Sequence, residues 1–396
     1  MKLVVVGHTY ITAISQSKYV AMKRVRPDLQ LRLVVPHEVN HVFMRYRPEI
    51  HPGLEPQDVV VLPAVVNNSQ MTRIMHPTRL AALLRTFGPD HIHIEEDPHS
   101  LTGVETVFLA RQVCPRPRIS FFIWDNLARV PRFPLSTLKA ALTRYSLARC
   151  DLVVCGNTEG QRLLGEFKGY AGPSVVLPQV GLEPEDYAVP LPSELAKELG
   201  KTDGTPLIGF IGRLVPEKGI LLLLEALSRL QALRWGLVII GNGPMREVIC
   251  TRWQGVLGER LRVLAPIPHT EVARYLRCLD IFVLPSYGIP TWKEQFGLTL
   301  AQAMMAGIAC IGSSSGAIPE VMGGSGLIFP ENDVGGLTSS LEMMIQSETE
   351  RTELGKKARA FALRRYTNNV VAGAYLRGFE ELAGACRNDS EYTPRG

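Results

Sequence analysis

The chain alternates short runs of apolar, mostly β-branched residues with longer segments of helical periodicity, and it does so in two successive series. The first series predicts strands at residues 3–6, 31–35, 59–62, 91–95, 119–124, 152–155 and 175–177. The second predicts strands at residues 207–211, 236–240, 262–264, 281–284, 309–311 and 326–328. Strands separated by helices form βαβ units, whose parallel strands are covered by helices on both faces. The pattern therefore predicts an α/β protein with two Rossmann-like, doubly wound parallel-sheet domains.

The segment between the two series is rich in Pro, Glu and Gly and lacks clear periodicity, which is typical of a linker. We expect an N-terminal domain over residues 1–185, a linker over 186–205 and a C-terminal domain over 206–365. The last segment, 366–396, is expected to form a helix that crosses back to the N-terminal domain, followed by a tail. Open α/β sheets bind ligands beyond the carboxyl ends of their strands, so the two domains are expected to face a central cleft.

Composition narrows the class of protein. Of the 396 residues, 46% are hydrophobic and 20% are charged, which indicates a globular enzyme and excludes a disordered chain. A net charge of +5 is too small for a dedicated nucleic-acid binder. The seven cysteines are scattered and form no C-x-x-C pair, which favours reduced thiols in the cytoplasm over a zinc site or a disulfide framework. No apolar run reaches the roughly 18 residues of a membrane span, so any membrane contact is expected to be peripheral.

One motif of the second series places two bases directly after a predicted strand. Residues 210–219 read FIGRLVPEKG. Gly212 permits backbone angles closed to other residues, and the helix that follows offers free N–H groups to an anion. Arg213 and Lys218 add two positive charges, so the arrangement suits a diphosphate. The alternative is an ordinary strand–turn–helix connection with two exposed bases.

Two further motifs follow later strands. Residues 241–244 read GNGP, a turn that lets a ligand approach the backbone, although a lone G-x-G is equally typical of a plain turn. Residues 294–304 read EQFGLTLAQAM, and residues 316–320 read GAIPE. Glu294 can accept hydrogen bonds from sugar hydroxyls, while the N–H groups of Gly297 and Leu298 can bind a phosphate. The amide of Gln302 can bind a diol such as that of ribose. The alternative is a capped amphipathic helix.

In order and spacing, these motifs resemble those of the GT-B glycosyltransferases of family 4, also called group 1. That family carries G-R-L-x-x-E-K-G, G-x-G-P, E-x-F-G-x-x-x-x-E-A-M and G-x-P-E in its C-terminal half. The resemblance implies a retaining transferase that moves a hexose-type sugar from a nucleotide-diphosphate donor, with UDP- and GDP-sugars expected first. It implies that Arg213 and Lys218 bind the diphosphate and stabilise the leaving nucleotide, and that Glu294 contacts the donor sugar.

The resemblance also assigns the remaining donor contacts. The donor-binding residues it implies are Gly212, Arg213, Lys218, Gly243, Ile267, Pro268, Glu294, Phe296, Gly297, Leu298 and Gln302. No metal and no other cofactor is expected, because the two bases take the place of a divalent ion. The sequence departs from the family at Gln302, where the family has a second glutamate. A neutral acceptor bonds hydroxyls more weakly than a charged one. This departure keeps open the alternative of an inactive or non-transferase nucleotide-sugar binder.

The N-terminal half offers candidate residues at three predicted strand ends. His8 follows the first strand, where many members of the family have a glycine. Glu95 and Glu96 follow the fourth strand, and Asp125 and Asn126 follow the fifth. Among them we assign Asp125 a catalytic role, and His8, Glu95, Glu96 and Asn126 a place beside the acceptor. The alternative for each is a solvated loop or a helix cap.

The acceptor is expected to be a glycan or a lipid-linked molecule in cell-surface polysaccharide or glycoconjugate synthesis. Eight bases and the single acid Asp125 lie between residues 106 and 150: Arg111, Arg116, Arg118, Arg129, Arg132, Lys139, Arg144 and Arg149. Such a stretch can attract an anionic membrane surface, or it can be a set of solvated helix faces. Other enzyme classes fit less well: the FIGRLVPEKG run disfavours a 2-epimerase, and a phosphorylase lacks its cofactor-lysine motif here. A dehydrogenase would need G-x-G-x-x-G where residues 7–10 read GHTY.

Overall fold

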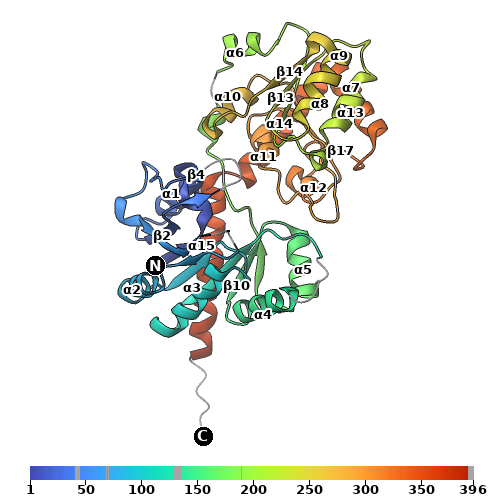
Figure 1. The fold of residues 1–396 in the computed structure, drawn as a ribbon. Coiled ribbons are helices and arrows are strands. Elements are labelled where there is room, and N and C mark those ends of the chain that lie inside the picture. Colours follow the sequence, from blue (N-terminus) through green and yellow to red (C-terminus); the bar gives the residue numbers. More distant parts are fainter. Residues whose placement is uncertain (41–44, 68, 70, 129–134, 189, 391–396) are drawn as a thin grey trace. The chain divides into compact units, whose positions relative to one another are not determined.

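The computed structural model describes residues 1–40, 45–67, 69, 71–128, 135–188 and 190–390 (Figure 1). They form two compact units. The N-terminal unit comprises Met1–Gly181 and Asn368–Gly396, and the C-terminal unit comprises Leu182–Thr367. The chain thus passes between the units twice, at residues 181–182 and 367–368.

The prediction of a linker at residues 186–205 is wrong. These residues cluster with the C-terminal unit, which begins at Leu182. They include the end of the short helix η4 (Pro184–Tyr187) and the helix α6 (Ser193–Glu198). Leu195 and Ala196 of α6 are buried, so apolar packing, which the Pro- and Glu-rich composition concealed, holds the segment in this unit.

The N-terminal unit is built on a seven-stranded parallel sheet in the order β11-β10-β9-β8-β1-β2-β5. Its strands are β1 (Lys2–Val6), β2 (Gln30–Pro36), β5 (Val59–Leu62), β8 (His91–Ile94), β9 (Arg118–Ile123), β10 (Leu152–Cys155) and β11 (Ser174–Val176). Almost every residue of the central strands is buried, because helices cover both faces of a doubly wound sheet. The order places β1 beside β8, although about ninety residues separate them in sequence.

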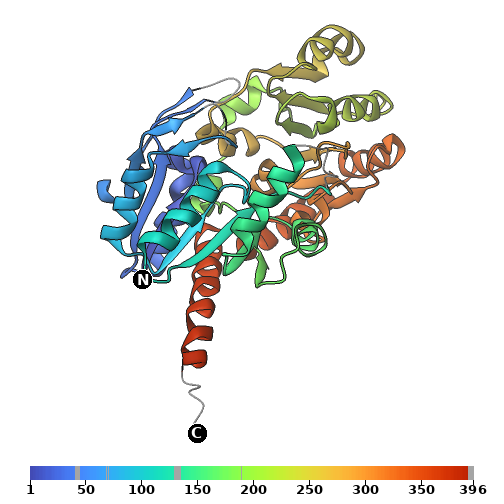
Figure 2. The same cartoon turned by 60° about the horizontal axis from the view of Figure 1, so that its bottom comes forward.

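The helices of this unit are α1 (Ser17–Val25), α2 (Pro77–Phe87), α3 (Leu101–Val113), α4 (Leu135–Leu147), α5 (Thr158–Lys168) and α15 (Asn368–Ser390), with short helices η1 (His8–Ile11), η2 (Ala13–Gln16) and η3 (Pro56–Asp58). α15 runs along the N-terminal unit (Figures 1 and 2) and packs against α1. Its Tyr375 and Phe379 belong to the core that covers one face of the sheet. Two short antiparallel pairs, β3 (Val39–Asn40) with β4 (Arg45–Tyr46) and β6 (Ala64–Val66) with β7 (Ile74–Met75), were not expected from the sequence.

The C-terminal unit is built on a six-stranded parallel sheet in the order β14-β13-β12-β15-β16-β17. Its strands are β12 (Leu207–Ile211), β13 (Gly236–Ile240), β14 (Leu261–Leu264), β15 (Ile281–Leu284), β16 (Ala309–Ser313) and β17 (Leu327–Phe329). Every strand expected from the sequence is present in one of the two sheets, with ends that differ by at most two residues. The predicted fold class, two parallel-sheet α/β domains, is confirmed.

Helices flank this second sheet. They are α7 (Ile220–Ser228), α8 (Arg246–Val248), α9 (Gln254–Leu257), α10 (Val272–Leu276), α11 (Leu298–Met305), α12 (Ile318–Met322), α13 (Val334–Gln346) and α14 (Glu348–Arg365). The short helices η5 (Pro216–Lys218), η6 (Ile249–Trp253), η7 (Gly258–Arg260) and η8 (His269–Glu271) complete the connections. α7 packs against α13, and α11 against α14, so the sheet is enclosed. The loops at the carboxyl ends of its strands carry the predicted motifs.

Candidate functional site

The first two motifs of the C-terminal unit meet at the carboxyl ends of the neighbouring strands β12 and β13. The backbone N–H of Leu214 donates to the carbonyl of Asn242 at 2.9 Å. Gly241 and Gly243 make this approach feasible, since a Cβ atom there would lie 1.9 Å from the carbonyl oxygen of Gly212 and 2.4 Å from that of Leu214. The glycines of the GNGP turn therefore serve loop-on-loop packing, which brings the backbone of both motifs to one edge of the sheet.

Lys218 and Glu294, from the first and third motifs, form an ion pair at this edge. Nζ of Lys218 lies 2.6 Å from Oε2 of Glu294, and the side chains are only 14% and 7% exposed. The ammonium also lies over the ring of Trp292, 4.8 Å from its centroid. Ser286, just after β15, donates to the same carboxylate oxygen at 3.1 Å. The ammonium of Lys218 is thus held between a carboxylate and the face of an indole ring.

Two glycines fix the two ends of this pair. Gly219, directly after Lys218, has φ +70°, and a Cβ atom there would lie 1.9 Å from the carbonyl oxygen of Pro285. Gly316 has φ +54°, and its Cβ atom would lie 2.2 Å from the carbonyl oxygen of Glu294. That carbonyl also accepts a hydrogen bond from the N–H of Ala317 at 3.0 Å. The fourth motif therefore supports Glu294 through its backbone, and only glycine fits the two close approaches.

Arg213 stands apart from this ion pair. It is exposed, and its guanidinium makes no ion pair or side-chain hydrogen bond to any residue that the structure describes. The structure thus joins two of the three residues expected to act together and leaves the charge of Arg213 in solvent, beyond the end of β12.

Gln302 lies on α11 and is buried, with 3% of its surface exposed. Its amide lies against the hydroxyl of Tyr187; burial raises the pKa of Tyr187, while the amide lowers it. Sequence reasoning missed Tyr187, because it falls in the segment taken for a linker. Its position after a Pro-Glu-Asp turn gave no signal of a contact with α11.

The other expected donor contacts are placed as follows. Gly297 starts α11 with φ +78°, a conformation that glycine adopts readily, and Leu298 is half-buried beside it. Phe296 is buried and packs edge-on against Tyr366, with ring centroids 5.6 Å apart. Ile267 is half-buried and Pro268 is exposed in the loop after β14. Phe296 thus has a clear packing role, whereas the loop after β14 exposes Pro268 to solvent.

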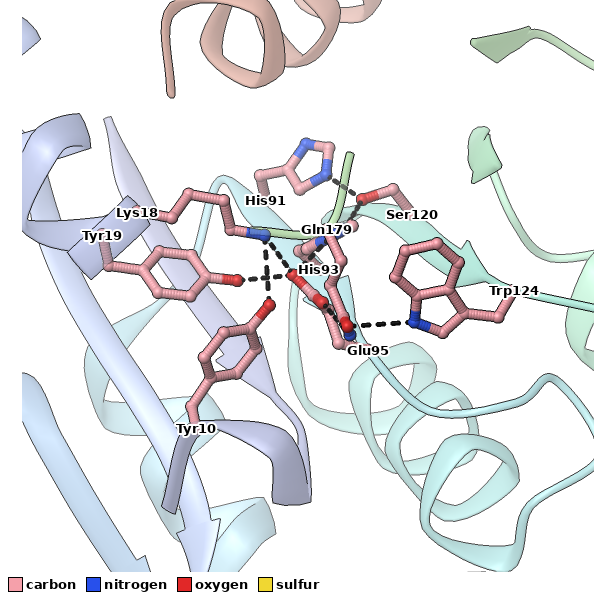
Figure 3. A network of polar contacts seen from close by, with 9 residues as sticks. All are labelled: Tyr10, Lys18, Tyr19, His91, His93, Glu95, Ser120, Trp124 and Gln179. Carbon is pink, nitrogen blue, oxygen red and sulfur yellow. Dashed lines mark hydrogen bonds and ion pairs between the residues drawn. The ribbon is translucent and has the colours of Figure 1, made fainter. Parts of the chain in front are cut away.

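In the N-terminal unit, Glu95 turns inward, so its expected place beside the acceptor is wrong for direct contact. Its carboxylate is 0% exposed, and Oε1 accepts hydrogen bonds from Nζ of Lys18 at 2.6 Å and the hydroxyl of Tyr19 at 2.7 Å (Figure 3). Gln179 donates to Oε2 at 2.8 Å and accepts from the indole N–H of Trp124 at 3.0 Å. Glu95 therefore ties α1 and the loops after β9 and β11 together from inside.

Further groups enclose the ammonium of Lys18. It donates to the hydroxyl of Tyr10 at 3.1 Å and lies 4.2 Å from the ring centroid of Tyr375 on α15. Nε2 of His93 lies 3.3 Å from Oε1 of Glu95, and His93 shares the hydroxyl of Ser120 with His91 (Figure 3). Burial would raise the pKa of Glu95, but Lys18 and His93 hold it well below its usual range. Burial lowers the pKa of Lys18 despite the attraction of Glu95.

The remaining candidates lie on the loops after β1, β8 and β9. Nδ1 of His8 lies 2.7 Å from Oε1 of Glu96, which also accepts the backbone N–H of His8 at 2.9 Å. Asp125 is half-buried, and Asn126 is buried with 1% exposure. His8 and Glu96 thus form a pair that the sequence did not predict, because 88 residues separate them.

The basic stretch of the N-terminal unit is partly used inside the fold. Arg111 and Arg118 lie 3.7 Å and 3.3 Å from the carboxylate of Asp151. Lys139 is exposed on α4, whereas Arg129 and Arg132 lie outside the described residues. Within the described ranges, no helix combines the length and apolarity needed to cross a membrane. In the same ranges, no cluster of three or more His, Cys, Asp or Glu side chains is arranged to hold a metal ion.

Comparison with known proteins agrees with this architecture. The family model described as glycosyl transferases group 1 matches residues 193–361. Over 194 residues, 46% of this chain, the sequence is 32% identical to a phosphatidyl-myo-inositol mannosyltransferase of Mycolicibacterium smegmatis. The match covers 48% of that relative, and the chain spans about half to two thirds of the length of the first curated relatives that it matches.

Solved structures resemble the whole chain. A glycosyltransferase from Rickettsia africae has a TM-score of 0.72 at 14% identity, covering 96% of this chain and 98% of its own. Anabaena Alr3699/HepE, solved in complex with UDP and glucose, has a TM-score of 0.68 at 17% identity, covering 96% and 100%. At this identity the likeness establishes the fold. The C-terminal unit is therefore similar to the glycosyl transferases group 1 over residues 193–361, and the chain has the GT-B fold of the solved structures.

Proposed function

We propose that this protein is a retaining glycosyltransferase that moves a hexose-type sugar from a nucleotide-diphosphate donor to a glycan or lipid-linked acceptor, without a metal ion. The observation that carries the proposal is the pair of Lys218 and Glu294 at the glycine-lined edge of the second sheet. A cation and a carboxylate at one point match the two ends of a sugar diphosphate, namely an anionic leaving group and a set of hydroxyls.

Donor binding exchanges the partner of Lys218. In the free protein its ammonium is neutralised by Glu294 and the ring of Trp292. A diphosphate oxygen replaces the carboxylate as the partner of Lys218, and Glu294 is then free to accept hydrogen bonds from sugar hydroxyls. The exposed Arg213 closes on the diphosphate from the loop after β12. Negative charge grows on the diphosphate as the glycosidic bond breaks, so both cations bind the transition state more strongly than the ground state.

Several relatives support the substrate classes. One is named phosphatidyl-myo-inositol mannosyltransferase, another is named GDP-mannose-dependent, and a solved neighbour holds UDP and glucose. These names favour a UDP- or GDP-sugar as the donor and a lipid-linked or glycan acceptor. The nucleotide is read by the loop around Ile267 and Pro268 and by Gln302. The exposed Lys139 and the neighbouring bases favour peripheral binding to the inner face of a membrane, which flotation with and without anionic lipid tests.

The test begins with the purified protein and a panel of UDP-, GDP- and ADP-sugars, each with and without EDTA. A bound donor raises the unfolding temperature, and donor hydrolysis and transfer are followed by release of the nucleoside diphosphate. Phosphatidylinositol vesicles and methyl α-D-mannopyranoside serve as acceptor probes. We expect one nucleotide class to bind and to turn over in EDTA, with the anomeric configuration of the product, read by NMR, the same as in the donor.

Lys218→Ala tests the assignment of the site. Losing a preorganised charge at the leaving group is expected to lower kcat by about 10²–10³-fold while the acceptor KM changes little. Lys356→Ala is the matched control, because Lys356 is 68% exposed and, among the described residues, its ion pair is with Glu353 on α14. Donor binding without hydrolysis or transfer would instead support the non-transferase nucleotide-sugar binder that Gln302 keeps open.

A further inference from the structure

The loop after β1 carries a histidine whose ring is held by a buried carboxylate. Oε1 of Glu96 lies 2.7 Å from Nδ1 of His8 and 2.9 Å from its backbone nitrogen. The Glu96 side chain is 3% exposed, whereas that of His8 is 19% exposed. β1 and β8 are neighbouring parallel strands, so their carboxyl ends bring these two residues to the same edge of the sheet.

The carboxylate fixes the proton on the ring. An ionised carboxylate only accepts hydrogen bonds, so Nδ1 must carry the hydrogen, and Nε2 of the neutral ring is left as an acceptor. Within the described part of the chain, Nε2 has no hydrogen-bond partner, although it is not sealed from solvent. Glu95, the neighbour of Glu96, is held by hydrogen bonds from Lys18 and Tyr19, which anchors the loop after β8. The protein therefore presents one oriented hydrogen-bond acceptor at this edge.

Charged groups around the ring of His8 shift its pKa. Burial alone would lower the pKa of His8, but the charge and hydrogen bond of Glu96 outweigh it, and the pKa is raised. Asp97 raises it further, and the buried guanidinium of Arg73 opposes the change. A ligand that covers the ring removes its remaining water, which disfavours the imidazolium. Binding of a hydroxyl to Nε2 is thus coupled to loss of a proton.

We propose that His8 determines acceptor specificity in this transferase: its Nε2 accepts a hydrogen bond from a hydroxyl of a polyhydroxylated acceptor, and Glu96 is the positioning residue that orients the ring. The inference rests on the proposed function and deepens it, because it names the atom that contacts the acceptor and the residue that orients it. If His8 only held the two loops together, it would need the same two hydrogen bonds to Glu96, but its replacement would not change the acceptor KM and the acceptor would not change its pKa.

The test compares His8→Phe, which keeps a ring of similar size without nitrogen atoms, with Glu96→Gln and with the control His76→Phe. His76 is another half-buried histidine of the N-terminal unit, and its Nδ1 lies 3.1 Å from the hydroxyl of Thr78. Transfer to methyl α-D-mannopyranoside and to phosphatidylinositol vesicles is measured from pH 5.5 to 8.5. Donor hydrolysis without acceptor is measured in parallel, and thermal unfolding checks that each variant is folded.

We expect His8→Phe to raise the acceptor KM about tenfold, the effect of one lost hydrogen bond, with donor hydrolysis within about twofold of the parent. In the parent, the acceptor KM rises as the pH falls through the His8 titration. His8→Phe abolishes this pH dependence, and Glu96→Gln moves it to lower pH because the carboxylate no longer favours the imidazolium. His76→Phe behaves as the parent. In NMR titrations, saturating acceptor lowers the pKa of His8.

Three outcomes would overturn the inference. An unchanged acceptor KM in a folded His8→Phe refutes it, as does a parallel loss of donor hydrolysis, which would indicate a structural defect. A parent enzyme that hydrolyses its donor but transfers to neither probe refutes the acceptor class. If the parent neither hydrolyses nor transfers, the proposed function itself fails, so the two failures are distinguished.

Discussion

Lys18 and Glu95 form an ion pair inside the N-terminal unit, and neither side chain exposes any surface. Lys18→Met removes the ammonium but keeps the length and most of the apolar stem. The carboxylate of Glu95 is then left buried without its ammonium partner, beside Tyr19, Gln179 and the imidazole of His93. Breaking a buried pair from one side costs about 3–5 kcal/mol, because a charge stays behind without its counter-charge. For a unit of this size, this corresponds to a fall in unfolding temperature of roughly 6–20 °C.

The pH dependence of unfolding shows whether the buried charge of Glu95 causes the loss of stability in Lys18→Met. Burial raises the pKa of Glu95, but in the parent Lys18 and His93 hold it well below its usual range. The stability that the pair contributes is therefore present above the unfolded pKa of about 4.3 and is lost as the pH falls. In Lys18→Met the main opposing cause is gone, so burial raises the pKa of Glu95. The variant then loses stability as the pH rises through that value, and its deficit is larger at pH 7.5 than at pH 4.

The double variant Lys18→Met/Glu95→Gln separates charge from shape. An amide keeps an acceptor for Tyr19 without a buried charge, and neutral replacements of buried pairs are often well tolerated. We expect the double variant to recover more than half of the loss, with a coupling energy of about 2 kcal/mol. Lys356→Met, from an exposed pair, should stay within about 0.5 kcal/mol of the parent.

Calorimetry measures the unfolding temperatures, and hydrogen exchange of peptides from β1, β8 and α1 reports on the N-terminal unit separately from the C-terminal unit. A loss below about 1 kcal/mol in Lys18→Met at pH 7.5, or an equal loss at pH 4 and pH 7.5, would refute the reasoning. Either result would mean that water or a rearranged neighbour neutralises Glu95.

Two further predictions concern single carboxyl positions. Burial raises the pKa of Glu105 to about 7 despite the hydrogen bond from the N–H of Met75, so its folded pKa lies above its unfolded value and stability falls as the pH rises through about 7. Glu105→Gln should therefore unfold at a higher temperature than the parent at pH 8 but not at pH 4, and equal differences in melts at both values would contradict this. Gln302→Glu restores the family's carboxylate and should tighten nucleotide binding about tenfold in calorimetric titration, while lowering the unfolding temperature of the free protein because the charge is buried near Tyr187. An unchanged affinity would exclude position 302 from the nucleotide site.

The sheet strands and much of the candidate site could be predicted because their signals are local. A buried parallel strand must be a short apolar run, so β12, β13 and β15 have the bounds that the sequence predicted. Loops that bind ligands follow such strands, which is how Lys218 and Glu294 could be singled out. The short pairs β3–β4 and β6–β7 could not be predicted, since two- and three-residue strands have no periodicity of their own.

The sequence by itself determined which segments form strands and which loops hold the candidate site, because burial of both sheet faces and the backbone freedom of glycine act within a few residues. Only the tertiary structure decided that Lys18 meets Glu95, that His8 meets Glu96, and that residues 182–205 belong to the C-terminal unit. The two residue pairs depend on strand order, because β1 becomes the neighbour of β8 only after the intervening chain has crossed the sheet. No local sequence pattern predicts that β1 and β8 are neighbours. Charge pairing across such distances is a property of the assembled sheet, so it became visible only in three dimensions.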